Sequence, residues 1–571
     1  MFFSSKLRRG VAVILTALMG VALPLAVSRA AESDTTASRR TPGQELTPQI
    51  LFDMLLAEIA LARGRLDYSL PLYERLARTT KDARVARRAT EIALYARRMD
   101  IAQETARIWA QADPASDDAQ RVLAGSLAGE KMTNEQIAMR LAQSLANAGA
   151  RLPGALLGLN RVLAPIEDKT RVRQIVERVT EPYLDLPEAH FARAHAASGG
   201  RDLDASLDEL NQALALRPDW SQAVLLKAQI QQTKSAEAAV MTLAAYLEVH
   251  PDDVDVRRGY ARALLSVKRY ADARAAFEQV LAAEPDDHAS RYAMGIIALE
   301  MGDVDAAAQA FEKLKSEGYS DHDGVETGLA QVAEARGDIE EAIAHYDAVK
   351  QPPRRERAQL RVAQLLATHG DLDGARKRLR ALGHDDASRA NYLLIEAQLL
   401  RDAGKVQEAV STVDEALKLK PDDPDLLYES AMLADRLGHT EAMEGKLRKI
   451  IALDPRYAHA YNALGYWLAD RGERLDEAES LIRKAVELRP KDPFIIDSLG
   501  WVRYRRGDLQ EARHLLEEAY SLRADPEIAA HLGEVMWEMG DQDGARKTWQ
   551  AAAKDYPDNT TLATVMRRYG Q

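Results

Sequence analysis

The sequence predicts an all-α protein built from tandem pairs of helices, and two observations carry this prediction. First, three stretches between residues 458 and 557 repeat one scheme, and each contains a Leu-Gly pair: Leu464-Gly465, Leu499-Gly500 and Leu532-Gly533. Second, eight glycines recur at intervals of 33 to 35 residues. The recurring glycines are Gly302, Gly337, Gly370, Gly404, Gly438, Gly472, Gly507 and Gly540. A period of that length is typical of helix-turn-helix repeats.

Three kinds of residue mark the ends of the predicted helices. The periodic glycines suit the left-handed conformation that ends the first helix of each pair. Prolines end the second helix, because a proline has no N–H to continue it. These prolines are Pro218, Pro251, Pro285, Pro421, Pro455, Pro490 and Pro557. Aspartate pairs such as Asp252-Asp253 and Asp422-Asp423 follow several of them, and we expect these carboxylates to cap the next helix.

Small residues predict where the two helices of a pair cross. In nine successive units the first helix carries alanine or glycine at the crossing position: Ala261, Gly295, Ala330, Ala363, Ala397, Ala431, Gly465, Gly500 and Gly533. The second helix carries an alanine and, four residues later, a large apolar residue, as in Ala273 and Phe277. A larger side chain at a crossing position would hold the helices apart. The register therefore predicts which residues pack.

The scheme AHAYNALGYWLADRGERLDEAESLIRKAVELRP, which begins at Ala458, resembles the tetratricopeptide repeat (TPR). That repeat has a period of about 34 residues per helix-turn-helix unit. The resemblance implies a right-handed α-solenoid, a superhelix of tandem TPR helix-turn-helix repeats. It also implies that the first helices of the units line an inner groove.

The first 45 residues differ from the rest of the chain. Residues 1–30 contain Lys6, Arg8 and Arg9, an apolar run at 11–27, and the small-x-small end Ser28-Arg29-Ala30. That order is typical of a secretory signal peptide; an uncleaved anchor helix is the alternative reading. Residues 31–45 are polar without apolar periodicity, and we expect a flexible linker there.

The remaining residues divide by the regularity of the repeat. We expect N-terminal TPR-like helical pairs at 46–114, where Leu56, Ala57 and Ala60 share one helical face. We expect irregular helices or degenerate repeats at 115–186, the regular TPR array at 187–557, and a C-terminal capping helix at 558–571. In 115–186 apolar residues still recur at helical spacing, around Ile137, Leu141, Leu145, Val172, Ile175 and Val179.

Charge and composition exclude several kinds of function. The net charge is −12, and without the four basic residues of 1–30 it becomes −16. A nucleic-acid partner calls for a basic stripe, so we expect none. The sequence contains no cysteine, which excludes a disulfide, a thiolate metal site, a cysteine nucleophile and a lipid-modified cysteine. An exported chain of this kind is expected in the periplasm, and not as a lipoprotein.

No motif of catalysis or cofactor binding stands out. The sequence has no nucleotide-binding loop, no His-Glu-x-x-His and no Gly-x-Ser-x-Gly. His190 and His195 are the nearest approach to a metal pair, but five residues apart on a helix they diverge, and no third ligand is nearby. We therefore predict no catalytic residue, no cofactor and no metal, and we expect binding rather than catalysis.

The register selects candidate residues for a partner-binding groove on the first helices. They are Tyr292, Tyr428, Asn462, Tyr466, Asp497, Trp501, Tyr504, Arg505 and Trp537. Aromatic side chains that packing does not require suit an extended peptide or a helix. The alternative is that these rings fill space between repeats. The TPR clamp for a C-terminal carboxylate repeats Asn and Lys at set positions; here Tyr466 follows Asn462 and no Lys matches, so this sequence departs from that mode.

Two segments are similar to a family of large exported bacterial TPR proteins: LAEIALARGRLDYSLPLYERLARTTKDARVARRATEIALYARRMDIAQETARIW, which begins at Leu56, and ALGYWLADRGERLDEAESLIRKAVELRPKDPFIIDSLGWVRYRRGDLQEARHLLEEAY, which begins at Ala463. The best-understood members of that family are outer-membrane lipoproteins that deliver cell-wall hydrolases to a periplasmic carboxyl-terminal processing protease. The resemblance implies a non-catalytic periplasmic adaptor with those partners, although this chain lacks the lipidated cysteine. The alternative is a structural scaffold in an envelope assembly for polysaccharide export or pilus biogenesis.

Overall fold

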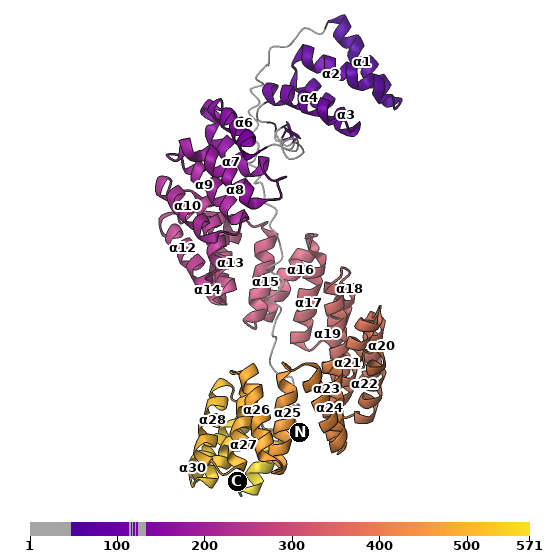
Figure 1. Ribbon diagram of the computed structural model, residues 1–571, viewed down its shortest axis with the longest axis vertical. Coiled ribbons are helices and arrows are strands. Elements are labelled where there is room, and N and C mark those ends of the chain that lie inside the picture. Colours follow the sequence, from indigo (N-terminus) through magenta and orange to yellow (C-terminus); the bar gives the residue numbers. More distant parts are fainter. Residues whose placement is uncertain (1–46, 114–115, 117, 120–121, 124–132, 571) are drawn as a thin grey trace. The chain divides into compact units, whose positions relative to one another are not determined.

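The computed structural model describes residues 47–113, 116, 118–119, 122–123 and 133–570 (Figure 1). Within these residues every regular element is helical, with 30 α-helices and two short 3-10 helices and no strand. This confirms the all-α solenoid of tandem helical pairs. The signal peptide and linker expected at 1–45 lie outside the described residues.

The chain forms two compact units, and the boundary between them in the sequence follows Asp303. The first half of the earlier unit contains α1 (Pro48–Ala62), α2 (Leu66–Thr80), α3 (Ala83–Tyr95), α4 (Met99–Ala112), α6 (Asn134–Ala146), η1 (Gly149–Arg151), α7 (Leu152–Val162), α8 (Lys169–Thr180), η2 (Glu181–Tyr183) and α9 (Pro187–Gly199). The second half contains α10 (Leu203–Leu216), α11 (Ser221–Gln232), α12 (Ala236–Val249), α13 (Val254–Ser266), α14 (Tyr270–Ala283) and α15 (His288–Glu300).

The later unit continues the same alternation of helices. It contains α16 (Val304–Ser316), α17 (His322–Arg336), α18 (Ile339–Ala348), α19 (Arg354–Thr368), α20 (Leu372–Leu382), α21 (Asp386–Asp402), α22 (Val406–Leu419), α23 (Pro424–Arg436), α24 (Thr440–Leu453), α25 (Ala458–Arg471), α26 (Leu475–Leu488), α27 (Pro493–Arg505), α28 (Leu509–Leu522), α29 (Pro526–Glu538), α30 (Gln542–Asp555) and α31 (Thr560–Arg568). Each helix packs mainly against its neighbours in sequence.

The periodic glycines end helices in the left-handed conformation, as the sequence predicted. All eight have positive φ, from 69° at Gly472 to 90° at Gly370. Non-glycine residues occupy some of the corresponding turns upstream, with positive φ at Arg97, Arg201 and Lys268. A side chain makes that conformation costly. The left-handed turn is nevertheless kept at these positions, although glycine is absent.

The expected aspartate caps are present. Asp253 accepts a hydrogen bond from the backbone N–H of Val256 at 2.9 Å. In the same way Asp423 accepts from the backbone N–H groups of Asp425 and Leu426. A carboxylate at this position satisfies a donor that the first helical turn leaves open and favours the positive end of the helix.

The small residues lie at the helix crossings. A Cβ added at Gly465 would stand 2.6 Å from Cγ1 of Ile482 and 2.9 Å from the backbone oxygen of Ala478. At Gly533 an added Cβ would stand 2.0 Å from Nε1 of Trp549. Since neither approach is possible between real atoms, the close contact of α25 with α26 and of α29 with α30 requires glycine.

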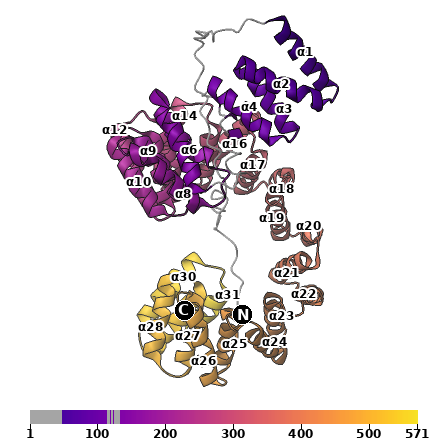
Figure 2. The same cartoon turned by 45° about the horizontal axis from the view of Figure 1, so that its top comes forward.

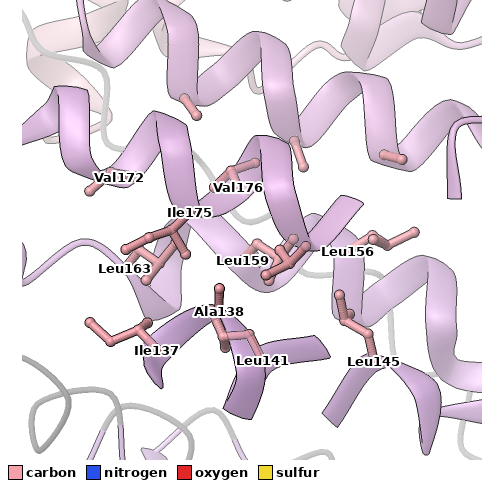
Figure 3. Packing of buried hydrophobic residues seen from close by; sticks show 14 of the residues in the cluster. Ile137, Ala138, Leu141, Leu145, Leu156, Leu159, Leu163, Val172, Ile175 and Val176 are labelled. Atoms are coloured by element: carbon pink, nitrogen blue, oxygen red, sulfur yellow. The ribbon is translucent and has the colours of Figure 1, made fainter. Parts of the chain in front are cut away.

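The segment around α6, α7, α8 and α9 has an apolar core (Figure 3). All six residues that the sequence singled out there are buried in this core: Ile137, Leu141, Leu145, Val172, Ile175 and Val179. Leu156, Leu159 and Leu163 join them from α7 and the turn that follows it. The helices are short, and 3-10 turns separate some of them.

One expectation for the first helix is wrong. Ala57 and Ala60 are buried against α2, but Leu56 is 41% exposed and lies outside the packed face. The packed stripe of α1 is narrow because small alanines face α2. At the other end of the chain α31 packs on α29 and α30, and Leu562 and Val565 are buried beneath it.

Candidate partner-binding groove

The first helices of the last repeats form one layer. α25 contacts α27, α27 contacts α29, and α29 contacts α31. In Figure 2 the second helices α26, α28 and α30 lie around the outside of this part of the chain, with α27 inside them. The residue that follows each Leu-Gly pair, namely Tyr466, Trp501 or Glu534, therefore occupies the same position on successive inner helices.

His531 of α29 is the centre of this layer. Its Nδ1 lies 2.9 Å from Oδ1 and 3.1 Å from Oδ2 of Asp497 on α27. The imidazole stacks on the indole of Trp501, with ring centroids 4.2 Å apart and 26° between the planes. On its other side, Nε2 lies 3.4 Å from the hydroxyl of Tyr466 on α25. Three successive repeats thus meet at one histidine.

The electrostatics of this group follow from burial among acids. Burial alone would lower the pKa of His531, but the adjacent Asp497 carboxylate, together with Glu534 and Glu527, raises it on balance. Burial raises the pKa of Tyr466 well above its ordinary value, and the nearby carboxylates add to the effect. Burial also raises the pKa of Glu534, whose carboxylate lies 2.7 Å from Nη1 of Arg568. Burial therefore disfavours charge of either sign here, and the neighbouring carboxylates offset this for a cation but not for an anion.

Two predicted groove residues are buried and take part in packing. Asp497 is 1% exposed and Trp501 is 7% exposed. The expectation that packing does not require these two side chains is wrong, because His531 covers the Asp497 carboxylate and stacks on the Trp501 indole. Nevertheless Trp501 is incompletely satisfied: its buried Nε1 has no hydrogen-bond acceptor among the described residues.

The structure brings Tyr504, Arg505 and Asn462 to the same layer. Tyr504 is partly exposed, with its ring centroid 5.0 Å from that of Trp501. Arg505 donates to the backbone oxygen of Asp470 at the end of α25, so it links two inner helices. The side-chain oxygen of Asn462 is buried and accepts no hydrogen bond within the part of the chain that the structure describes.

The other three predicted residues lie apart from His531. Trp537 packs at the C-terminal end against Trp549 and Tyr569, at centroid distances of 5.8 Å and 5.2 Å. Tyr428 belongs to a separate aromatic group, 5.8 Å from Tyr457. Tyr292 is partly buried on α15 and belongs to the other compact unit. The nine candidates therefore do not form one site.

Sequence reasoning missed the residues that give the layer its charge: His531, Glu527 and Glu534. The sequence contains a signal for two of them, because ion pairs connect residues that lie one repeat period apart. His531 follows Asp497 by 34 residues, and Arg568 follows Glu534 by 34 residues. Glu534 also stands directly after a Leu-Gly pair, the position that selected Tyr466 and Trp501.

Neither a metal site nor a membrane span is found in the described ranges. No group of three or more His, Asp or Glu side chains there could hold a metal ion. His190 contacts a carboxylate of Glu209 and the backbone oxygen of Leu184, at 2.6 Å and 2.9 Å, which accounts for both its ring nitrogens. No helix in those ranges is long and apolar enough to cross a bilayer.

Comparison with known proteins decides the family. One tetratricopeptide repeat model matches residues 232–297, 264–332 and 503–569, and a second matches 327–386, 360–424, 394–444 and 428–493. A TPR repeat-containing protein of Pseudomonas aeruginosa is 34% identical over 485 residues, which cover 85% of this chain and 82% of that protein. The chain belongs to the tetratricopeptide repeat family. TPR repeats generally bind protein partners and are generally non-catalytic.

Other known proteins are less similar to this chain in sequence. Cellulose synthase operon protein C of Pseudomonas fluorescens is 27% identical over 192 residues, which are 32% of this TPR chain but only 15% of that protein. Among solved structures, yeast Tom70 is 15% identical, with a TM-score of 0.37 over 76% of this chain and 95% of that one. A thermophilic TPR protein of Thermus thermophilus is 25% identical, with a TM-score of 0.29 over 31% of this chain and 95% of that one.

Proposed function

We propose that this TPR protein is a non-catalytic adaptor and that the inner layer of α25, α27 and α29 binds a segment of a partner protein. The observation that carries the proposal is the group around His531. It leaves Tyr466 and Tyr504 partly exposed beside the unsatisfied indole N–H of Trp501. Partly exposed aromatic rings with a polar edge are common on protein-binding surfaces.

We propose further that the adaptor works in the periplasm and delivers cell-wall hydrolases to a carboxyl-terminal processing protease. Support comes from the signal-peptide pattern of residues 1–30 and from the resemblance of the segments that begin at Leu56 and Ala463. Since the chain contains no cysteine, the adaptor is free in the periplasm or held by an uncleaved N-terminus. The N-terminal pairs, α1 to α4, are the proposed second contact, because their sequences deviate most from the repeat pattern.

A second candidate is a structural scaffold in an envelope assembly. The observation that favours it is the 27% identity over 192 residues to a protein named for a cellulose synthase operon. A scaffold for polysaccharide export would use the same repeat surface to hold components together. The two candidates differ in the partners they predict.

Affinity capture from an envelope extract separates the candidates. The full chain is the bait, and captured proteins are identified by mass spectrometry. Recovery of a serine protease together with a cell-wall hydrolase supports the adaptor. Recovery of secretin or polysaccharide-synthesis components instead would contradict it and favour the scaffold.

Substitutions locate the binding surface. Because Trp501 is buried, Trp501→Phe is preferable to alanine, and it is combined with Tyr504→Ala. We expect the double variant to lose the captured partner while its helicity by circular dichroism is unchanged. Tyr556→Ala is the matched control, since Tyr556 is 42% exposed in the turn before α31. Full retention of binding by the double variant would place the site elsewhere.

A further inference from the structure

The first helix that the structure describes has an apolar outer face. α1 packs on α2 through Ala57 and Ala60, while its opposite side carries five large apolar side chains that are 41% to 59% exposed. They are Leu51, Phe52, Leu55, Leu56 and Ile59. From Leu51 to Ala62 every exposed side chain of α1 is apolar. A helix that is apolar all round is usually buried on every side.

The helix at the C-terminal end of the chain has the opposite character. α31 buries Leu562 and Val565 against its neighbours. Its exposed residues are mostly polar, namely Thr560, Ala563, Thr564, Arg567 and Arg568. A polar outer face is what a terminal repeat needs to stay soluble. α31 has such a face and α1 does not, so the outer face of α1 requires a cover.

The described residues of the chain do not supply this cover. First helices of later pairs also pack on the second helix before them, as α3 does on α2 and α13 on α12, but the substantial contacts of α1 are with α2 alone. Residues 31–46, which precede α1 directly, are polar and contain one large apolar residue, Leu46. The apolar run at 11–27 belongs to the expected signal peptide, which export would remove. The cover is therefore expected from another molecule.

The chemistry of the face favours an identical face as its partner. A lipid surface is disfavoured, because interfacial helices combine an apolar face with lysine and arginine, and the only charged residues of α1 are Asp53 and Glu58. The C-terminal end of another copy is disfavoured too, because its exposed Arg567 and Arg568 would lose water against an apolar surface. Two α1 faces can meet without burying a charge.

The spacing of the side chains also fits a pair of identical helices. Leu51, Leu55 and Ile59 form one ridge along α1, and Phe52 and Leu56 form the next, because residues four apart lie in rows on a helix. The groove between two such rows accepts a row of a facing helix. A two-fold axis gives both copies this fit at once.

The area of the face is sufficient for a weak dimer. A large side chain offers about 200 Å² when it is fully exposed, so five that are about half exposed present about 500 Å² per copy. Two copies would bury about 1,000 Å² between them, which is the lower bound for a specific interface. An interface of this size is typical of reversible association.

We propose that the outer face of α1 is a self-association surface, at which two copies of this chain pair about a two-fold axis. Leu55 lies at the centre of the face, so the two Leu55 side chains meet across the axis. The expected dissociation constant is micromolar, about 1–100 µM. The pairing uses none of the groove on α25, α27 and α29 and does not depend on the binding function proposed there.

Sedimentation velocity tests the proposal. The chain is purified as cells produce it, its N-terminus is identified by mass spectrometry, and its mass is measured over a concentration series. We expect a reversible change from the monomer to twice the monomer mass as the concentration rises.

A charge at the centre of the face should prevent pairing. In Leu55→Glu two carboxylates would face each other, and we expect the dissociation constant to rise about 100-fold. Since Leu55 is exposed in the single chain, the helicity by circular dichroism should not change. Met139→Glu is the matched control, because it introduces the same charge at an exposed apolar position on α6, and it should dimerise like the native chain.

A single thiol locates the axis independently of that variant. The chain contains no cysteine, so Leu55→Cys introduces a unique one. Helices that pack about 8–10 Å apart bring facing Cα atoms within reach of a disulfide. We therefore expect mild oxidation to link two copies of Leu55→Cys, and to leave Met139→Cys unlinked at the same concentration.

The other occupants of the face are outcomes that would overturn the proposal. A native chain that stays monomeric throughout the series would do so, whether it lacks residues 1–30 or retains them to cover α1. Equal dissociation constants for Leu55→Glu and Met139→Glu, or equal cross-linking of the two thiol variants, would do so as well. A monomer that floats with vesicles of phosphatidylethanolamine and phosphatidylglycerol, and ceases to float as Leu55→Glu, would assign the face to a lipid surface instead.

Discussion

The inner helices of α17–α24 and those of α25–α29 bury carboxylates in different ways. In the earlier repeats the two buried glutamates, Glu396 and Glu429, each pair with arginine from another helix. Glu396 lies 2.8 Å from each of Arg376 and Arg380, and Glu429 lies 2.6 Å from Arg401. Of the partly buried glutamates on α17, Glu334 pairs with Arg361, and Glu326 pairs with Lys315 and His345. In the last repeats the carboxylates of Asp497 and Glu534 meet His531 and the exposed Arg568, and the partly buried Glu527 has no ion pair among the described residues.

The difference separates a permanent contact from an adjustable one. Arginine keeps its charge at every pH that a protein tolerates, so the earlier repeats have fixed links between neighbours. Histidine changes its charge near neutral pH, and Glu527 has its pKa raised to about 7. Since both regions have the same repeat geometry, the charge pattern of the last repeats is not needed to build the fold. We attribute it to binding.

Removing an arginine from the earlier repeats should have the largest effect on stability. In Arg401→Met the Glu429 carboxylate, whose side chain is 4% exposed, loses its partner in the interior. We expect the free energy of unfolding to fall by about 3 kcal/mol, as for other broken buried pairs. Urea denaturation followed by circular dichroism measures this change.

Arg568→Met is the matched variant in the last repeats. The Glu534 side chain is also only 4% exposed, but the Arg568 side chain is 63% exposed, so solvent screens this pair more strongly and we expect a smaller loss, about 1 kcal/mol. Equal losses for the two variants would show that the two regions hold their carboxylates in the same way.

Gly465→Leu tests what the two regions share. The new side chain would collide with Ile482 and the backbone of Ala478, and such overpacking costs about 1–3 kcal/mol. Ala431→Leu, at the same position in the preceding unit, should cost about as much. Gly445→Leu is the control, because a Cβ at this exposed position on α24 meets nothing within 4 Å. The midpoint of thermal unfolding reports the difference, and a normal midpoint for Gly465→Leu would refute the packing register.

The smallest expected effect depends on pH. The pKa of Glu527 is about 7 in the folded chain, above its ordinary 4.5, so between these values the folded state holds a proton that the unfolded state has lost. Its contribution therefore favours folding at low pH and is lost as pH rises through this window. We expect Glu527→Gln to be more stable than the native chain by about 1 kcal/mol near pH 8 and no different near pH 4.

The control for this measurement is Glu518→Gln, which removes an exposed carboxylate from α28 and should leave stability unchanged at both pH values. Thermal unfolding at a series of pH values gives the comparison. If the stabilisation by Glu527→Gln did not vary with pH, ionisation of the Glu527 carboxylate would not be its cause, and the prediction would be wrong.

The sequence predicted the fold well because the fold is periodic. Glycine turns and small crossing residues recur, so each copy supports the others, and the structure confirms them. The upstream turns at Arg97, Arg201 and Lys268 were harder to find, because left-handed arginine and lysine leave no signature in composition.

The candidate site was harder to predict because its chemistry is not periodic. Asp497 on an inner helix looks like a solvent-exposed acid, and only its contact with His531 of the next repeat shows that it is buried. Whether Trp501 packs or protrudes likewise depends on the neighbouring ring. Position in the repeat predicted which residues face inward, but not how residues of adjacent repeats pair.

The repeat length has a consequence for the distance between docked proteins. Gly404 and Gly438 end equivalent helices 34 residues apart, so deletion of residues 405–438 would join two matching turns. Each helix packs chiefly on its sequence neighbours, and the new junction would meet surfaces of the same kind. A chain that docks two proteins at separate repeats could thus act as a ruler whose length changes in whole units, while neither docking surface is altered.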